Sequence, residues 1–140
     1  MSERVSILDA AIREAARVPR PVCVSFSGGR TSGLMLWSFL QAYGGTLPDE
    51  VRVIFSNTGK ERPETLDFVE ECSQRWGVRI TWLEFRPGDE QWAEVGHNSA
   101  SRAGEPFAAL IGQRNALPNP VARMCTEALK VRPMVRYCRD

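Results

Sequence analysis

The sequence predicts an α/β fold, in which helices cover both faces of a mostly parallel β-sheet and form a three-layer sandwich. Between residues 6 and 85, short apolar segments alternate with segments that carry apolar side chains at helical spacing. Such alternation is typical of βαβ units and of parallel strands. The apolar segments are nearly continuous, as expected for strands buried on both faces. The chain has 140 residues, 43% of them hydrophobic and 25% charged, so we expect a single domain over residues 1–140.

The first predicted unit is a helix, a strand and a second helix. Apolar side chains at helical spacing favour a helix over residues 6–17, and Pro19 and Pro21 end it. An apolar strand over residues 21–25 follows. The second helix, over residues 31–43, is rich in Leu, Met, Trp and Phe and stops at a pair of glycines.

The second predicted unit repeats this order. A strand over residues 51–55 runs into a polar turn, and Pro63 then begins a helix, where its missing N–H costs nothing. Gly77 ends this helix, and residues 78–85 are predicted as the third strand.

The chain changes character after the third strand. Residues 86–120 are rich in Gly and Pro, and we expect an irregular, lid-like segment broken by a short helix over residues 107–114. Residues 121–138 return to a helical pattern, which Pro133 is expected to kink or restart.

Charge and cysteine spacing exclude several classes of protein. The net charge of +1 gives no strong field for nucleic acid or membrane, and no apolar run is long enough to span a bilayer. The N-terminus lacks an apolar signal segment, so we expect a cytoplasmic protein. The four cysteines are widely spaced, without a zinc-finger pattern, and no metal site is predicted.

The stretch SFSGGRTSG, residues 25–33, lies where the first strand ends and the second helix begins. Gly28 and Gly29 can take conformations that bring the backbone close to a ligand. The first amides of a helix lack internal partners, and the hydroxyls of Ser27, Thr31 and Ser32 add donors, so this turn is suited to phosphate or sulfate. The stretch is neither a Walker A motif nor a GxGxxG motif. The alternative is a tight turn whose serines only cap the helix.

The order SGGRTS resembles the PP-loop of the adenine nucleotide α-hydrolase-like superfamily, whose Rossmann-like members bind ATP or adenylyl sulfates. The stretch SNTGKERPET, residues 56–65, resembles the DTG…PET segment of phosphoadenosine phosphosulfate (PAPS) reductase-like proteins, with Asn57 where aspartate is usual. The stretch RMCTEALKVRPM, residues 123–134, resembles the C-C-x-x-x-K-x-x-P-L segment of sulfonucleotide reductases. The intervening stretch RAGEPFAALIGQRNALPNPVARMCT is also similar to phage and prophage PAPS reductase-like proteins, and the resemblance runs from about residue 21 to the C-terminus.

The resemblance implies that an adenine nucleotide, either ATP or PAPS/APS, binds at the carboxyl ends of the first two strands. The residues implied in binding are Ser25, Phe26, Ser27, Gly28, Gly29, Arg30, Thr31, Ser32, Ser56, Asn57, Thr58, Gly59, Lys60 and Arg123. Catalytic roles are implied for Cys125, Lys130 and Arg30. Mg²⁺ is a candidate companion ion, and the isolated cysteines are too few for an iron–sulfur cluster.

Departures from the family pattern leave the activity open. The C-terminal cysteine motif of the reductases is absent, and Arg30 and Thr31 replace the common Lys and Asp, which weakens the case for Mg²⁺. The first hypothesis is an enzyme of sulfur metabolism that acts at the α-phosphate or sulfonyl group. The alternatives are a nucleotide-binding module without full catalysis and a subunit of a nucleic-acid sulfur-modifying system. A thiol donor protein and a second copy of the chain are further candidate partners, and contact with nucleic acid is left open.

Overall fold

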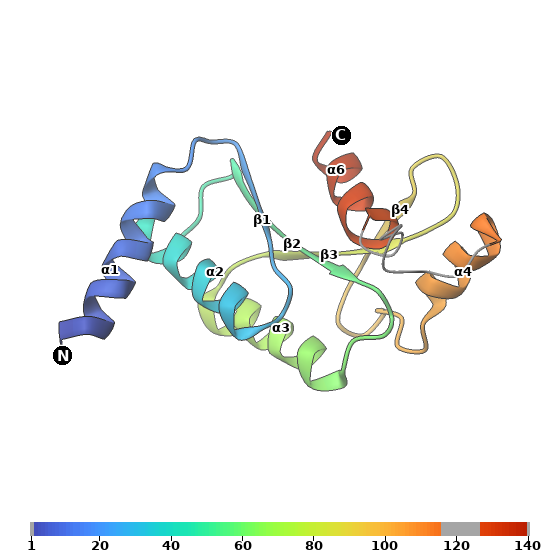
Figure 1. Ribbon diagram of the computed structural model, residues 1–140, viewed down its shortest axis with the longest axis horizontal. Coiled ribbons are helices and arrows are strands. Elements are labelled where there is room, and N and C mark those ends of the chain that lie inside the picture. The colour runs from blue at the N-terminus through green and yellow to red at the C-terminus, as the bar shows by residue number, and fades with distance from the viewer. Residues whose placement is uncertain (1, 116–126, 140) are drawn as a thin grey trace.

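A computed structural model describes residues 2–115 and 127–139 of the protein (Figure 1). Its elements, in chain order, are α1 (Ser2–Arg17), β1 (Val22–Ser25), α2 (Arg30–Ala42), β2 (Val51–Asn57), α3 (Pro63–Trp76), β3 (Ile80–Phe85), β4 (Trp92–Val95), α4 (Glu105–Arg114), the π-helical turn η1 (Glu127–Val131) and α6 (Arg132–Arg139).

The sheet has the order β1-β2-β3-β4, so each strand lies beside its neighbour in the sequence. The first three strands are parallel, with Val24 beside Val53 and Val53 beside Ile80, and β4 is antiparallel to β3. Helical crossovers join the parallel strands, as a parallel sheet requires. This arrangement confirms the predicted α/β class with a mostly parallel sheet.

Alternation along the strands assigns the helices to two faces. Val53 and Phe55 of β2 belong to the large core that also contains residues of α2 and α3, such as Leu36 and Leu66. Because successive side chains of a strand point to opposite faces, the intervening positions face the other side. There Phe85 packs with residues of α4 and η1. Figure 1 shows the result, with α2 and α3 below the sheet and α6 above it.

Several boundaries differ from the sequence-based prediction. Strand β2 continues to Asn57, two residues further than expected, because its pairing with β3 extends to Asn57, which lies beside Glu84. Helix α1 begins at Ser2 and α4 at Glu105, each earlier than predicted. The C-terminal helical segment restarts at α6, with Pro133 in its first turn, where proline is tolerated.

The segment after β3 is less irregular than its Gly and Pro content predicts, because it contains β4. This strand pairs with β3 through Phe85 beside Trp92 and Trp82 beside Val95. Gly88 (φ 129°) and Gln91 (φ 64°) have positive φ in the connection that reverses the chain. The turn residues were visible in the sequence, but the four-residue strand between two loops was not predicted.

Each helix within the described ranges is too short or too polar to cross a membrane.

Candidate functional site

The loops after β1 and β2 meet at one edge of the sheet. These strands are parallel neighbours, so their carboxyl ends lie side by side. The Phe26 amide donates a hydrogen bond to the Ile54 carbonyl (2.8 Å), which continues the strand pairing into the first loop. The Phe26 side chain is only 1% exposed and stacks on Phe68. Phe26 is one of the predicted binding residues, but only its backbone can face a ligand at this edge.

Gly28 fits the first loop against α3 in a way that only glycine allows. Its φ is +81°, in the region that L side chains rarely adopt. A Cβ atom at this position would lie 2.7 Å from the Thr65 Cγ2 atom and 3.1 Å from the Val69 Cγ2 atom. Both the conformation and the packing therefore require glycine. Gly29 differs, because its φ is −94° and its nearest neighbour would be the Ser27 Oγ atom at 3.6 Å.

The Ser32 hydroxyl fastens the loop from within. The amides of Ser27 (3.3 Å) and Gly29 (3.2 Å) donate to its Oγ atom, which also hydrogen-bonds to the Ser27 hydroxyl (2.9 Å). Gly29 is the N-cap of α2, and the amides of Arg30 and Thr31 follow it in the first turn, where helical geometry provides no acceptor. The donors left for an anion are therefore those of the α2 N-terminus, fewer than the sequence predicts.

Asn57 in the second turn is part of the protein interior. The side chain is fully buried, and its Nδ2 atom donates to the Glu84 Oε1 atom (2.6 Å) and the Ser101 carbonyl (2.9 Å). Its Oδ1 atom accepts a hydrogen bond from the Gly59 amide (3.3 Å). The Asn57 amide group thus shapes the turn and joins it to β3 and to a later loop.

Thr58 and Gly59 are also packed tightly. The Lys60 amide donates to the Thr58 Oγ1 atom (3.3 Å), and the Thr58 hydroxyl donates to the Glu61 carboxylate (3.3 Å). A Cβ atom on Gly59 would lie 3.0 Å from the Gly104 Cα atom, and the Gly104 amide donates to the Gly59 carbonyl (2.9 Å). The turn after β2 is therefore bound to the start of α4.

Glu84 is the site residue that the sequence analysis missed. This carboxylate of β3 has no exposed surface and accepts hydrogen bonds from Asn57, from the amide and hydroxyl of Ser101, and from the Arg86 guanidinium (2.8 Å). Burial would raise the pKa of Glu84, but the hydrogen bonds from Ser101, Arg86 and Asn57 outweigh burial and hold the pKa below its usual range. The sequence did contain a signal for this residue, because Glu84 is the one acidic residue in the mostly apolar strand ITWLEF. A carboxylate buried in such a strand needs a hydrogen-bonding or charged partner.

Three predicted cations come to this edge from three segments. Arg30 begins α2, Lys60 follows β2, and the Lys130 carbonyl of η1 accepts a hydrogen bond from the Ser56 hydroxyl (3.3 Å) near the end of β2. All three side chains are exposed, and none of them takes part in an ion pair within the described part of the chain. The edge thus combines helix-terminal amides with uncompensated positive charge, which suits an anion.

The remaining predicted residues are placed as follows. Ser25 is exposed at the end of β1, and Thr31 is exposed in the first turn of α2. Arg123 and Cys125 lie outside the described residues. Within those residues, no three His, Cys, Asp or Glu side chains gather as a metal-binding group.

The family profile of the phosphoadenosine phosphosulfate reductase domain matches residues 21–140. The chain belongs to this family. It is 30% identical over 125 residues to the uncharacterized nin region protein ORF290 of Escherichia phage lambda, covering 84% of this chain and 42% of that protein. It is 27% identical over 124 residues to the uncharacterized protein MJ0066 of Methanocaldococcus jannaschii, covering 89% of this chain and 21% of that protein.

This PAPS reductase-family chain therefore spans less than half the length of either of these relatives. No solved structure matches it. The matched region contains all of the sheet, both edge loops and the η1–α6 segment.

Proposed function

We propose that this protein binds an adenine nucleotide, ATP or PAPS/APS, at the carboxyl edge of β1 and β2 and acts at its α-phosphate or sulfonyl group. The observation that carries the proposal is the position of three basic residues at the edge that holds the glycine-rich loop: Arg30 begins α2, Lys60 follows β2, and the Lys130 backbone is hydrogen-bonded to Ser56. Membership of the PAPS reductase family supports an adenine nucleotide as the source of the anion.

The phosphate or sulfate oxygens would bind the amides of Arg30 and Thr31, where the α2 dipole favours negative charge. The Arg30 guanidinium can pair with two oxygens of one phosphate, whereas Lys60 and Lys130 would supply point charges. Backbone groups of Ser56 and Asn57 remain the candidates for the adenine edge, since the Asn57 side chain is already occupied within the protein.

Two reactions fit this arrangement. With ATP, an acceptor oxygen attacks the α-phosphorus and pyrophosphate leaves, its charge neutralised by the cations. With PAPS or APS, a thiolate attacks sulfur, an S–S bond forms, and the S–O bond to the nucleotide breaks. A second thiol, from a donor protein or a small molecule, then releases sulfite. We retain Cys125 as the candidate thiol and Mg²⁺ as a companion of ATP.

Binding is tested by calorimetry on the full chain with ATP, PAPS, APS and AMP. Gly29→Ala adds a methyl group at the N-cap of α2 at an ordinary φ, with only the Ser27 Oγ atom nearby at 3.6 Å, so we expect the variant to stay folded and its affinity to fall about tenfold or more. Gly112→Ala in α4 is the matched control, because a Cβ atom there has no neighbour within 4 Å. Equal affinities for the wild type and Gly29→Ala would refute binding at the loop.

Charge is tested separately. Arg30→Gln and Lys130→Met should each weaken binding about tenfold to a hundredfold, the range of a charge-assisted hydrogen bond. Arg13→Gln, an exposed change on α1, should leave affinity unchanged.

The two candidate reactions are distinguished by the products released from the nucleotide, measured with and without Mg²⁺ and a thiol. Pyrophosphate release identifies α-phosphate chemistry, and sulfite release identifies reduction. Binding without either product identifies the nucleotide-binding module. If a nucleic acid must be added for turnover, the sulfur-modifying alternative holds.

A further inference from the structure

A pair of cysteines lies at the opposite end of the strands from the proposed nucleotide site. Cys23 is in β1 and Cys138 is near the end of α6, and both line one cavity of about 450 Å³. The other lining residues belong to the amino ends of β1 and β2 and the residues just before them, such as Pro21 and Glu50. This cavity is therefore distinct from the edge that carries the glycine-rich loop.

The packing of α6 on the sheet brings the two cysteines together. Cys23 lies beside Arg52 in the register of β1 and β2. The Arg52 guanidinium lies over the Tyr137 ring, 5.7 Å from its centroid. The Tyr137 ring also packs edge-on against Trp92 of β4 at 5.2 Å between centroids. Because Tyr137 is held on two sides, the next residue, Cys138, is fixed over β1.

The environments of the two thiols differ. Cys23 is partly covered, whereas Cys138 is exposed. Burial raises the pKa of Cys23 to about 12, helped by the charge and hydrogen bond of the neighbouring Cys138 and opposed by Arg52. Cys23 therefore keeps its proton and remains hydrogen-bonded to Cys138, which is the thiol that a reagent in solution reaches first.

We propose that Cys23 and Cys138 form a redox-active dithiol that reacts with low-molecular-weight disulfides and closes into an intrachain disulfide. The Cys138 thiolate attacks the disulfide of the oxidant, forming a mixed disulfide and releasing one thiol. Cys23 gives its proton to solvent and attacks the Cys138 sulfur, which releases the second thiol. The two cysteines lose two electrons and two protons, and the oxidant is reduced to two thiols.

The disulfide would join β1 to α6 covalently. Helix α6 continues directly from η1, whose Lys130 carbonyl is bonded to Ser56 at the other end of β2. Oxidation therefore fastens the η1–α6 segment to the sheet at two points, one covalent and one hydrogen-bonded. A rise in the midpoint of thermal unfolding is the expected signature of a cross-link that closes a long loop.

The test treats the full chain with glutathione buffers from reduced to oxidised, followed by acid quenching, alkylation and mass spectrometry of the intact and digested protein. The expected result is a mass loss of two hydrogens and a cross-linked peptide pair containing Cys23 and Cys138. Cys72→Ser and Cys125→Ser should keep this cross-link. Cys23→Ala and Cys138→Ser should abolish it, with Cys23→Ala leaving glutathione attached to Cys138.

Three results would overturn the proposal. The first is a cross-link that uses Cys125 or Cys72 in place of either residue. The second is a disulfide between two chains, detected as a dimer on a non-reducing gel. The third is a wild-type chain that holds glutathione on Cys138 after prolonged equilibration without closing the intrachain bond. Circular dichroism of each variant verifies that loss of the cross-link does not reflect unfolding.

Discussion

Replacing Glu84 by glutamine tests whether the buried carboxylate holds the turn after β2 and the loop at Ser101 in place. The Oε2 atom of Glu84 accepts hydrogen bonds from the Arg86 guanidinium (2.8 Å) and the Ser101 hydroxyl (2.8 Å). A charge-assisted hydrogen bond contributes about 1.5–3 kcal/mol. The Arg86 side chain is 42% exposed, so water recovers part of its loss, and the Ser101 hydroxyl can turn to accept from the new amide. We expect Glu84→Gln to lower the free energy of unfolding by about 2–3 kcal/mol at pH 7.

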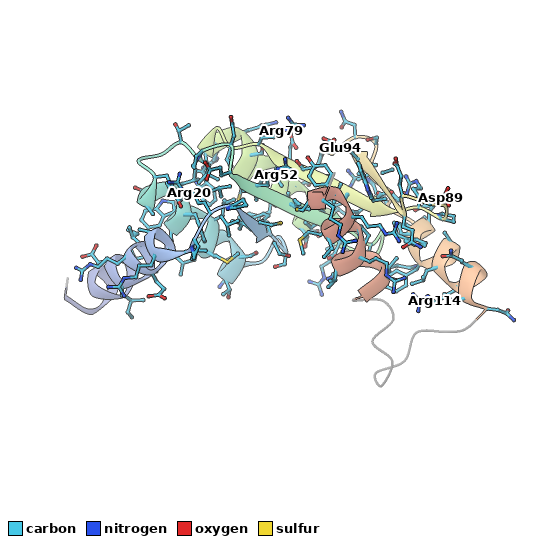
Figure 2. The ribbon with its side chains drawn as sticks, turned by 90° about the horizontal axis from the view of Figure 1, so that it is seen from above. Arg20, Arg52, Arg79, Asp89, Glu94 and Arg114 are labelled. Atoms are coloured by element: carbon cyan, nitrogen blue, oxygen red, sulfur yellow. The ribbon has the colours of Figure 1, made fainter. Side chains whose placement is uncertain are left out.

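The measurement is urea unfolding of the wild type and Glu84→Gln as a function of pH. The folded-state pKa of Glu84 is lowered, so its contribution is present above the ordinary value of 4.5 and is lost as the pH falls through the folded pKa. The difference between the two proteins should be constant from pH 5.5 to 8 and shrink in acid. Glu94→Gln is the control, because its carboxylate lies on the surface of β4, 3.4 Å from Arg79 (Figure 2).

The control should change stability by less than about 0.5 kcal/mol. A loss below that value for Glu84→Gln as well would refute the reasoning, since it would mean that the buried carboxylate contributes no more than a surface ion pair. So would a difference that grows as the pH falls.

Three further substitutions test the edge loops by urea or thermal unfolding. Gly28→Ala should lower the free energy of unfolding by about 2–4 kcal/mol, because the side chain is strained at positive φ and also clashes with α3. Gly45→Ala is the control, since its φ is +96° but the space around it is open, and it should show the strain alone at about 1–2 kcal/mol. Equal losses for the two variants would contradict the packing of the loop against α3. Ser32→Ala should lower the free energy of unfolding by about 1 kcal/mol by removing the acceptor of two loop amides, and an unchanged melting temperature would argue against that role. Asn57→Asp should cost about 2–4 kcal/mol at pH 7, because it sets a second carboxylate against Glu84, and this loss should shrink in acid as the pair takes up a proton; a loss independent of pH would contradict it.

The fold was predictable from the sequence where local pattern decides it. The alternation of apolar strands and amphipathic helices identified β1, β2 and β3 and the helices between them, because burial on both faces leaves a clear apolar signature. Strand β4 was missed because it has only four residues, WAEV, of which just one is charged. Its formation depends on pairing with β3. Such pairing is a tertiary fact that no local window contains.

The candidate site divides in the same way. The glycine-rich loop could be located from the sequence, because Gly28 reports a special backbone conformation. The hydrogen bonds that the Asn57 Nδ2 atom donates could not be predicted, because Glu84 and Ser101 follow Asn57 by 27 and 44 positions in the sequence. Sequence reasoning assigned the backbone near Asn57 to the ligand on the strength of a motif, which stays a prediction, and the structure adds that the Asn57 side chain holds Glu84 and the Ser101 loop. The roles of the exposed residues at the edge remain predictions.

The hydrogen bonds that the Ser32 hydroxyl accepts from the loop amides determine when the conformational entropy of the loop is lost. Since the amides of Ser27 and Gly29 have a partner within the protein, the loop is ordered when the chain folds. A ligand arriving at the α2 N-terminus then meets a preorganised surface and bears little of the ordering cost. Association at such a surface is expected to be fast and to show no conformational phase that precedes or follows the encounter.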